Sequence, residues 1–134
     1  KLNILGDISK FSTKLKKTLI TAIKKTSKNK KLQINLALNY GSKNEIIRSI
    51  KLIFKKKLKI NINNFEKNLY TANLPDPDIL IRTGKTNRLS NFLLWQISYS
   101  EIFFLNKLWP DFSKKDYYSI LKQYQNTVRK YGNI

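Results

Sequence analysis

Residues 76–112 read DPDILIRTGKTNRLSNFLLWQISYSEIFFLNKLWPDF, and this stretch decides both the fold class and the candidate site. The short apolar run 79–81 predicts a buried strand. The run ends at Arg82, and Arg88 and Ser90 follow within one short polar loop. Arginine binds oxyanions through a planar fork of donors, and open α/β sheets place their ligands at strand ends. The stretch therefore predicts a site for an anion with several oxygens, such as a diphosphate.

Strands and helices alternate on both sides of this stretch, which predicts an α/β fold with a mostly parallel sheet covered by helices. Further strands are predicted at residues 1–5, 32–38 and 101–105. A helix capped by Ser12 is predicted between the first two strands. An S-x-x-E capping box, Ser42 with Glu45, predicts a second helix with apolar residues at helical spacing as far as Leu58.

Three shorter helical segments complete the prediction. One is expected at residues 64–70, before Pro75 and Pro77 prevent regular structure, and another at residues 90–96. Ser113 and Asp116 resemble a capping box that opens a final helix. We find neither an internal repeat nor an interdomain linker, so residues 1–134 are expected to belong to a single domain.

The charge of the chain suggests nucleic-acid binding at first sight. The formal net charge is +19, but only four of the 27 basic residues are arginine. Nucleic-acid surfaces usually rely on arginine for bidentate contacts, and two of the four, Arg82 and Arg88, already lie in the predicted anion site. A solvated, lysine-rich surface is therefore the favoured interpretation, with no specific nucleic acid as a partner.

Other functional classes are excluded or made unfavourable by composition. The chain has no cysteine and no histidine, so it has no disulfides and no cysteine- or histidine-ligated metal. Hydrophobic residues make up 41% of the chain, enough for a core. No apolar run approaches bilayer length and no signal peptide is visible, so a cytoplasmic location is expected.

The order of several motifs resembles one enzyme family. The motifs are IRTG at 81–84, RLSNFLLWQ at 88–96, SYSE at 98–101 and LWPDF at 108–112, preceded by NLALNYGSKNEI at 35–46 and LNILGD at 2–7. Together they resemble the cis-prenyltransferases, most closely the bacterial undecaprenyl diphosphate synthases. The family's domain begins with a segment carrying an Asp-Gly-Asn-Gly-Arg-type loop, which has no counterpart here. The resemblance thus implies the C-terminal portion of a single cis-prenyltransferase domain.

The resemblance also implies roles for individual residues. Arg82, Arg88 and Ser90 would grip the diphosphate of isopentenyl diphosphate, and Glu101 would bind Mg²⁺. Leu32 would lie at the closed end of the hydrophobic tunnel that limits product length. The catalytic Asp belongs to the segment without a counterpart, so no catalytic residue is expected in this chain. The residues alone leave other roles open: the arginines and Glu101 could form salt bridges, and Leu32 could be an ordinary core leucine.

The implied activity is prenyl transfer, an isoprenoid-biosynthesis reaction. Isopentenyl diphosphate condenses with an allylic diphosphate, such as farnesyl diphosphate, to make a long-chain cis-polyprenyl diphosphate that associates with the membrane. The resemblance implies a homodimer with the aromatic block 92–104 near its interface, and an element at residues 129–132 that reaches the neighbouring subunit's site. This chain alone is expected to be inactive. Alternatives are a non-catalytic subunit, an inactive remnant of the family, and a basic nucleic-acid-binding protein.

Two departures from the family pattern bear on the site. Lys85, Thr86 and Asn87 stand where the family usually has Gly, Glu and often His. This exchange removes an acidic partner near the metal and adds a cation that could touch phosphate. Ser42 and Lys43 stand in place of Gly-Arg after Gly41, and a lysine keeps the charge but loses the fork of donors.

Overall fold

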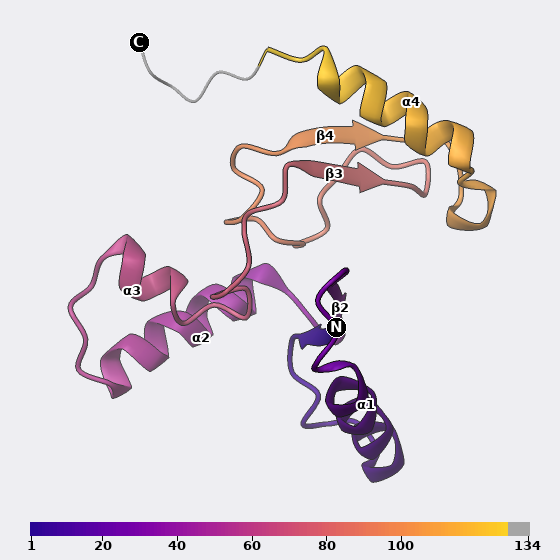
Figure 1. Ribbon diagram of the computed structural model, residues 1–134. Helices are drawn as coiled ribbons and strands as arrows, with labels where there is room; N and C mark the ends of the chain where they lie inside the picture. Colours follow the sequence, from indigo (N-terminus) through magenta and orange to yellow (C-terminus); the bar gives the residue numbers. More distant parts are fainter. Residues whose placement is uncertain (129–134) are drawn as a thin grey trace. The chain divides into compact units, whose positions relative to one another are not determined.

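The computed structural model describes residues 1–128 and divides into two compact units, shown in Figure 1. The first unit ends at Leu74 and the second begins at Pro75. Pro75 and Pro77 lie at the start of the second unit, in a segment without helix or strand, as the sequence predicts. Within residues 1–128, no helix has the length and apolar character needed to cross a membrane.

The first unit is built on a pair of parallel strands. β1 (Leu2–Leu5) pairs with β2 (Ile34–Ala37), with Leu2 opposite Ile34. The chain crosses from one to the other through α1 (Thr13–Thr26), which contacts β1. The Ser12 hydroxyl caps this helix by accepting from the Leu15 N–H at 3.3 Å, which confirms the predicted cap.

The apolar face predicted for residues 32–38 is largely open in this unit. Leu32 precedes the strand and is 66% exposed, while Ile34 and Leu36 are 50% and 39% exposed. Parallel sheets are normally covered on both faces. This strand pair therefore presents apolar surface that the first unit by itself leaves exposed.

Two helices follow, and the predicted capping box at the start of the first is wrong. α2 (Ser42–Lys55) has Gly41 as its N-cap, without a side-chain capping bond, so Ser42 is already helical. The Glu45 carboxylate instead accepts bonds from Tyr40 and Tyr70. The helix ends at Lys55, so the predicted periodic residue Leu58 lies beyond it.

The buried side of α2 is more polar than the sequence pattern suggests. Ser42, Glu45 and Ser49 are buried together with Ile53, whereas Ile47 and Phe54 are exposed. The Ser49 hydroxyl donates to the Phe65 carbonyl at 2.7 Å and so fastens α2 to α3 (Ile62–Glu66). α3 overlaps the helical segment predicted at residues 64–70, but it begins and ends earlier than predicted.

The second unit repeats the parallel pairing. β3 (Ile79–Arg82) lies beside β4 (Glu101–Phe104), with Ile79 opposite Glu101 and Arg82 opposite Phe104. A 3-10 turn, η1 (Trp109–Asp111), leads to α4 (Lys114–Gln125). Ser113 and Asp116 form the predicted capping box at the start of α4. Ile120, on the apolar side of that helix, is buried.

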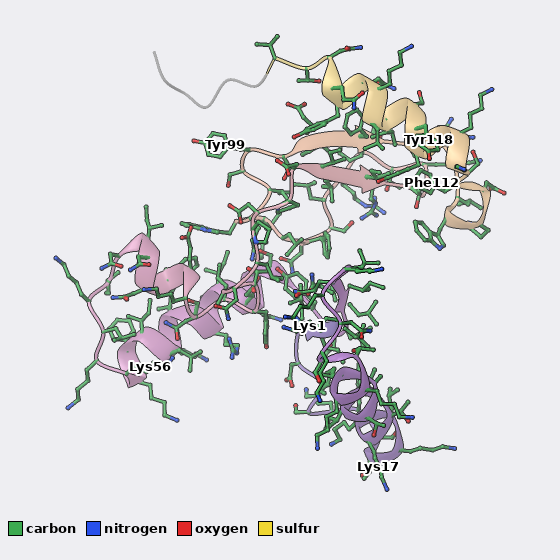
Figure 2. All side chains as sticks on the ribbon, viewed as in Figure 1. Lys1, Lys17, Lys56, Tyr99, Phe112 and Tyr118 are labelled. Atoms are coloured by element: carbon green, nitrogen blue, oxygen red, sulfur yellow. The ribbon has the colours of Figure 1, made fainter. Side chains whose placement is uncertain are left out.

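The helix predicted at residues 90–96 is wrong. Residues 91–99 form bends and turns, and Ser90, Asn91 and Leu93 have positive φ angles of 49°, 60° and 45°. A right-handed helix requires negative φ at every residue, so three left-handed residues interrupt it. Within the aromatic block 92–104, Ile97 is buried, while Tyr99 is 60% exposed and stands clear of the ribbon in Figure 2.

Candidate functional site

The predicted anion site begins where β3 ends. Arg82 is the last residue of the strand and is half-buried. Its carbonyl accepts from the Leu105 N–H at 2.8 Å, which extends the pairing of β3 and β4 by one bond. Its guanidinium Nη2 donates to the Thr86 Oγ1 at 3.3 Å. The side chain therefore points into the loop that follows the strand.

This loop is held against the segment that follows β4. The Gly84 N–H donates to the Lys107 carbonyl at 2.7 Å. Gly84 has φ +103° and Lys85 has φ 56°, so the chain turns sharply through two left-handed residues. Glycine adopts this conformation without the steric cost that a Cβ brings. The backbone position of the loop is thus set by the segment after β4 as well as by β3.

Arg88 and Ser90 lie further along the same loop, and both are exposed. Arg88 and Ser90 thus lie in the loop that follows β3, and Arg82 is the last residue of that strand; their role in binding an anion stays a prediction. Lys85 adds a third cation to that loop and is also exposed. An exposed group of cations and a hydroxyl after a strand end can bind an anion without displacing any structural contact.

Glu101 lies at the other end of the strand pair. It is the first residue of β4, and its N–H donates to the Asp78 carbonyl at 2.9 Å. Arg82 pairs three positions further along, at Phe104. A strand advances about 3.3 Å per residue, so the levels of Glu101 and Arg82 differ by about 10 Å. Within this unit, the structure does not bring the predicted metal ligand to the predicted diphosphate ligands.

Few carboxylates are available to hold a Mg²⁺ ion in the described part of the chain. Across residues 1–128, no group of three or more Asp, Glu, His or Cys side chains is arranged to hold a metal ion. Mg²⁺ prefers octahedral oxygen ligands, often one or two carboxylates with phosphate oxygens and waters. One carboxylate with phosphate oxygens is compatible with this chemistry, so the role of Glu101 as a Mg²⁺ ligand stays a prediction.

Leu32 belongs to the first unit and borders a hollow. The hollow has a volume of about 690 Å³, and its apolar lining includes Leu2, Leu32 and Ile34. Its remaining lining is polar or basic: Lys1, Thr26, Lys28, Asn29, Lys30 and Lys31. Leu32 is exposed at the rim of this hollow, and both the tunnel role and the core role stay predictions.

A buried carboxylate that the sequence did not mark as functional organises the turn after β2. Glu45 is 1% exposed. Its Oε1 accepts from the Tyr70 N–H at 2.7 Å, and its Oε2 accepts from the Tyr40 hydroxyl at 2.5 Å. Arg48 lies over the Tyr70 ring at 4.4 Å and donates to the Asn68 carbonyl at 3.0 Å. The turn at residues 39–41 is therefore tied to the chain after α3.

The sequence carried only a weak signal for this network. An S-x-x-E pattern is typical of a helix start, so the local sequence predicts a capping role for Glu45. The available clue to burial is that Glu45 is followed directly by Ile46 and Ile47 and has a tyrosine five residues before it, because a buried carboxylate needs donors. The terminal element predicted at 129–132 lies outside the described residues.

The comparisons with known proteins agree with the fold and the motif order. Residues 1–132 match the prenyltransferase family model described as "Putative undecaprenyl diphosphate synthase". An isoprenyl transferase from Clostridium tetani is 44% identical over 140 residues, which span 99% of this chain and 55% of that relative. A ditrans,polycis-undecaprenyl-diphosphate synthase from Micrococcus luteus, described as specific for (2E,6E)-farnesyl diphosphate, is 39% identical and is covered over 57% of its length.

Solved structures show the same similarity in three dimensions. A probable undecaprenyl diphosphate synthase from Campylobacter jejuni matches with a TM-score of 0.89 at 39% identity, over 99% of this chain and 63% of that one. Lavandulyl diphosphate synthase from Lavandula x intermedia, solved with dimethylallyl diphosphate, matches with a TM-score of 0.91 at 31% identity, over 99% and 60%. The chain thus spans little more than half the length of the curated relatives it matches.

Proposed function

Because this chain belongs to the undecaprenyl diphosphate synthase family of prenyltransferases, we propose that the protein takes part in prenyl transfer. In the proposed reaction, isopentenyl diphosphate condenses with an allylic diphosphate, with farnesyl diphosphate as the expected allylic substrate. The product would be a long-chain cis-polyprenyl diphosphate. This chain would supply the half of the site that holds isopentenyl diphosphate.

The observation that carries the proposal is the loop after β3. Arg82 is oriented into it by Thr86, and Arg88 and Ser90 are exposed on it. Two guanidiniums can each donate a pair of parallel hydrogen bonds to phosphate oxygens, and a serine hydroxyl can donate one more. The role of these residues is to bind and orient the diphosphate, so that the double bond of the substrate faces its reaction partner.

In this proposal the loop residues do not bind the diphosphate that leaves the allylic substrate, so other groups must stabilise it. Charge neutralisation on that diphosphate is the chemistry that Mg²⁺ supplies when bound. A role for Glu101 as a ligand stays a prediction for a complete site, as do homodimer formation, a cytoplasmic location and product association with the membrane. The 134 residues contain no Asp-Gly-Asn-Gly-Arg run. We therefore expect no turnover from this chain on its own.

The binding half of the proposal is tested by titrating the chain with isopentenyl diphosphate and with isopentenol, which lacks the diphosphate. Isopentenyl diphosphate should bind and isopentenol should not. Arg82→Lys and Arg88→Lys should each weaken binding at least about tenfold, because a lost hydrogen bond to a charged group costs about 1.5–3 kcal/mol. Equal binding of the two compounds would overturn the proposal.

Arg48→Lys is the matched control, because Arg48 packs on Tyr70 in the first unit rather than in the loop. This variant should leave the affinity for isopentenyl diphosphate unchanged, whatever it does to the stability of the first unit. The turnover expectation is checked with labelled isopentenyl diphosphate, farnesyl diphosphate and Mg²⁺. Butanol-extractable product above background would show that the chain is active alone.

A further inference from the structure

Charges of opposite sign are separated along the β3–β4 pair. The loop after β3 carries Arg82, Lys85 and Arg88, and no acidic residue occurs between Asp78 and Glu101 in the sequence. Those two carboxylate residues lie together at the other end of the pair, where the Glu101 N–H meets the Asp78 carbonyl at 2.9 Å. The loop itself therefore carries only cations: Asp78 and Glu101 lie at the other end of the strands, and Asp116, beside the segment that holds Gly84, is paired with Lys107 at 2.7 Å.

Lys85 occupies a defined place in this loop. It follows Gly84, whose N–H is held by the Lys107 carbonyl at 2.7 Å, and its own φ of 56° fixes the chain in the left-handed region. Its side chain is exposed, and among residues 1–128 its ammonium has no acidic partner within ion-pair distance. The same is true of the Arg88 guanidinium. Both charges are consequently available to an incoming anion.

We propose that the loop of residues 82–90 binds a diphosphate group without a divalent metal, and that Lys85 supplies the charge that a metal would otherwise provide. The inference rests on the proposed function, since it concerns the same diphosphate. A diphosphate carries several negative charges, and three cations can offset most of them. A lysine ammonium is a compact point charge on a flexible stem, so it can follow the phosphate oxygens that the two arginine forks leave free.

The proposal predicts whether added Mg²⁺ strengthens or weakens the binding of a diphosphate to the loop. Mg²⁺ binds free diphosphates through their oxygens and lowers their net charge. If the loop recognises the uncomplexed anion, then added Mg²⁺ should weaken binding or leave it unchanged. If the metal were part of the site, Mg²⁺ should strengthen binding instead.

The experiment is a calorimetric titration of the 134-residue chain with inorganic pyrophosphate and with isopentenyl diphosphate, once with EDTA and once with Mg²⁺, at near-physiological salt. Both ligands should bind in EDTA. Lys85→Asn should weaken binding in EDTA at least about tenfold, because asparagine tolerates the left-handed backbone while removing the charge. Lys85→Arg should retain most of the affinity.

Lys115→Asn is the matched control: it removes one exposed lysine from α4, outside the loop, and should leave the affinity unchanged. Circular dichroism should show equal helix content in all variants. Binding that requires Mg²⁺ would overturn the inference and leave the proposed function intact. Absence of binding under both conditions would overturn the proposed function as well. Equal losses in Lys85→Asn and Lys115→Asn would show bulk charge attraction and overturn the inference.

Discussion

Gly84 and Lys107 connect the loop of residues 82–90 to the N-terminal end of α4. The Gly84 N–H donates to the Lys107 carbonyl at 2.7 Å, and the Lys107 Nζ lies 2.7 Å from the Asp116 Oδ1. The Asp116 Oδ2 accepts from the N–H and the hydroxyl of Ser113 at 2.9 and 2.6 Å. One lysine therefore holds the loop through its backbone and the helix cap through its side chain.

We expect Lys107→Met to loosen the loop without unfolding the unit. The Gly84 amide should exchange faster with solvent, and pyrophosphate affinity should fall by about two- to fivefold, as is typical of an exposed ion pair. The measurement combines hydrogen exchange by NMR with calorimetry. Lys107→Arg should restore both values, and Lys115→Met should change neither. An unchanged Gly84 exchange rate in Lys107→Met would show that the side chain does not position the loop.

Acidification should weaken the same connection. The hydrogen bond from Lys107, followed by those from Ser113, lowers the pKa of Asp116 well below its ordinary value of 3.8. A carboxyl with a lowered pKa in the folded state stabilises that state above its unfolded pKa, and this contribution is lost as pH falls toward the folded value. Stability of the wild type should therefore decline below about pH 4.

The check is urea unfolding followed by tryptophan fluorescence at several pH values between 2 and 6, since both Trp95 and Trp109 lie in the second unit. The decline should be shallower in Lys107→Met, which lacks the main cause of the lowered pKa. Parallel pH profiles for the wild type and the variant would contradict the assignment.

Gly6→Ala should destabilise the first unit strongly. Gly6 has φ +115°, and an added Cβ would lie 2.2 Å from the Leu38 carbonyl oxygen. The strained backbone alone costs about 1–3 kcal/mol, and the clash forces β1 and β2 apart. The Leu38 amide, which donates to the Leu5 carbonyl at 2.9 Å, should lose its protection from hydrogen exchange.

Gly84→Ala provides the matched comparison. Gly84 has φ +103°, but an added Cβ would meet no atom within 4 Å. It should therefore carry the backbone cost without the clash, and it should destabilise its own unit less than Gly6→Ala destabilises the first. A larger loss at Gly84 would mean that the close approach of Gly6 to Leu38 is unimportant.

Glu45→Ala should destabilise the first unit by about 2–4 kcal/mol, because two donors, the Tyr70 N–H and the Tyr40 hydroxyl, lose a buried acceptor. Glu45→Gln should cost less, since the amide keeps one acceptor and can donate to the Tyr40 oxygen. Urea unfolding followed by circular dichroism measures both. Tyr40→Phe should fall between wild type and Glu45→Ala. Equal stability of Glu45→Ala and the wild type would show that the network is dispensable.

The contrast between two serines shows what sequence could predict. Ser113 and Asp116 form their capping box because both partners lie within one turn of chain, and local sequence suffices for such a bond. Ser42 and Glu45 have the same spacing, yet Glu45 bonds to Tyr70, which is distant in sequence. A better partner supplied by tertiary structure overrides the local pattern, and no local pattern reveals it.

The strand β3 and the position of the loop after it could also be predicted from local sequence. The run before Arg82 is apolar and short, so β3 and the loop after it were predictable, and the order of the motifs gave the family. Residues 90–96 were not predictable in the same way. Their composition suits a helix, but the positive φ angles at Ser90, Asn91 and Leu93 are imposed by the surroundings rather than by side-chain propensity. The placement of Glu101 at the opposite end of the pair from Arg82 follows from register, which the motif order does not encode.

The two strand pairs are closed by connections of different kinds, and this bears on the order in which the units fold. α1 spans most of the connection from β1 to β2, and a helix with its own cap can form early from local contacts. The connection from β3 to β4 contains turns and left-handed residues instead of a helix. Closing this connection costs conformational entropy, and that cost comes before the free energy gained when β3 and β4 pair. We therefore expect the first unit to acquire its strand pair sooner, and the loop of residues 82–90 to be among the last parts of the chain to take shape.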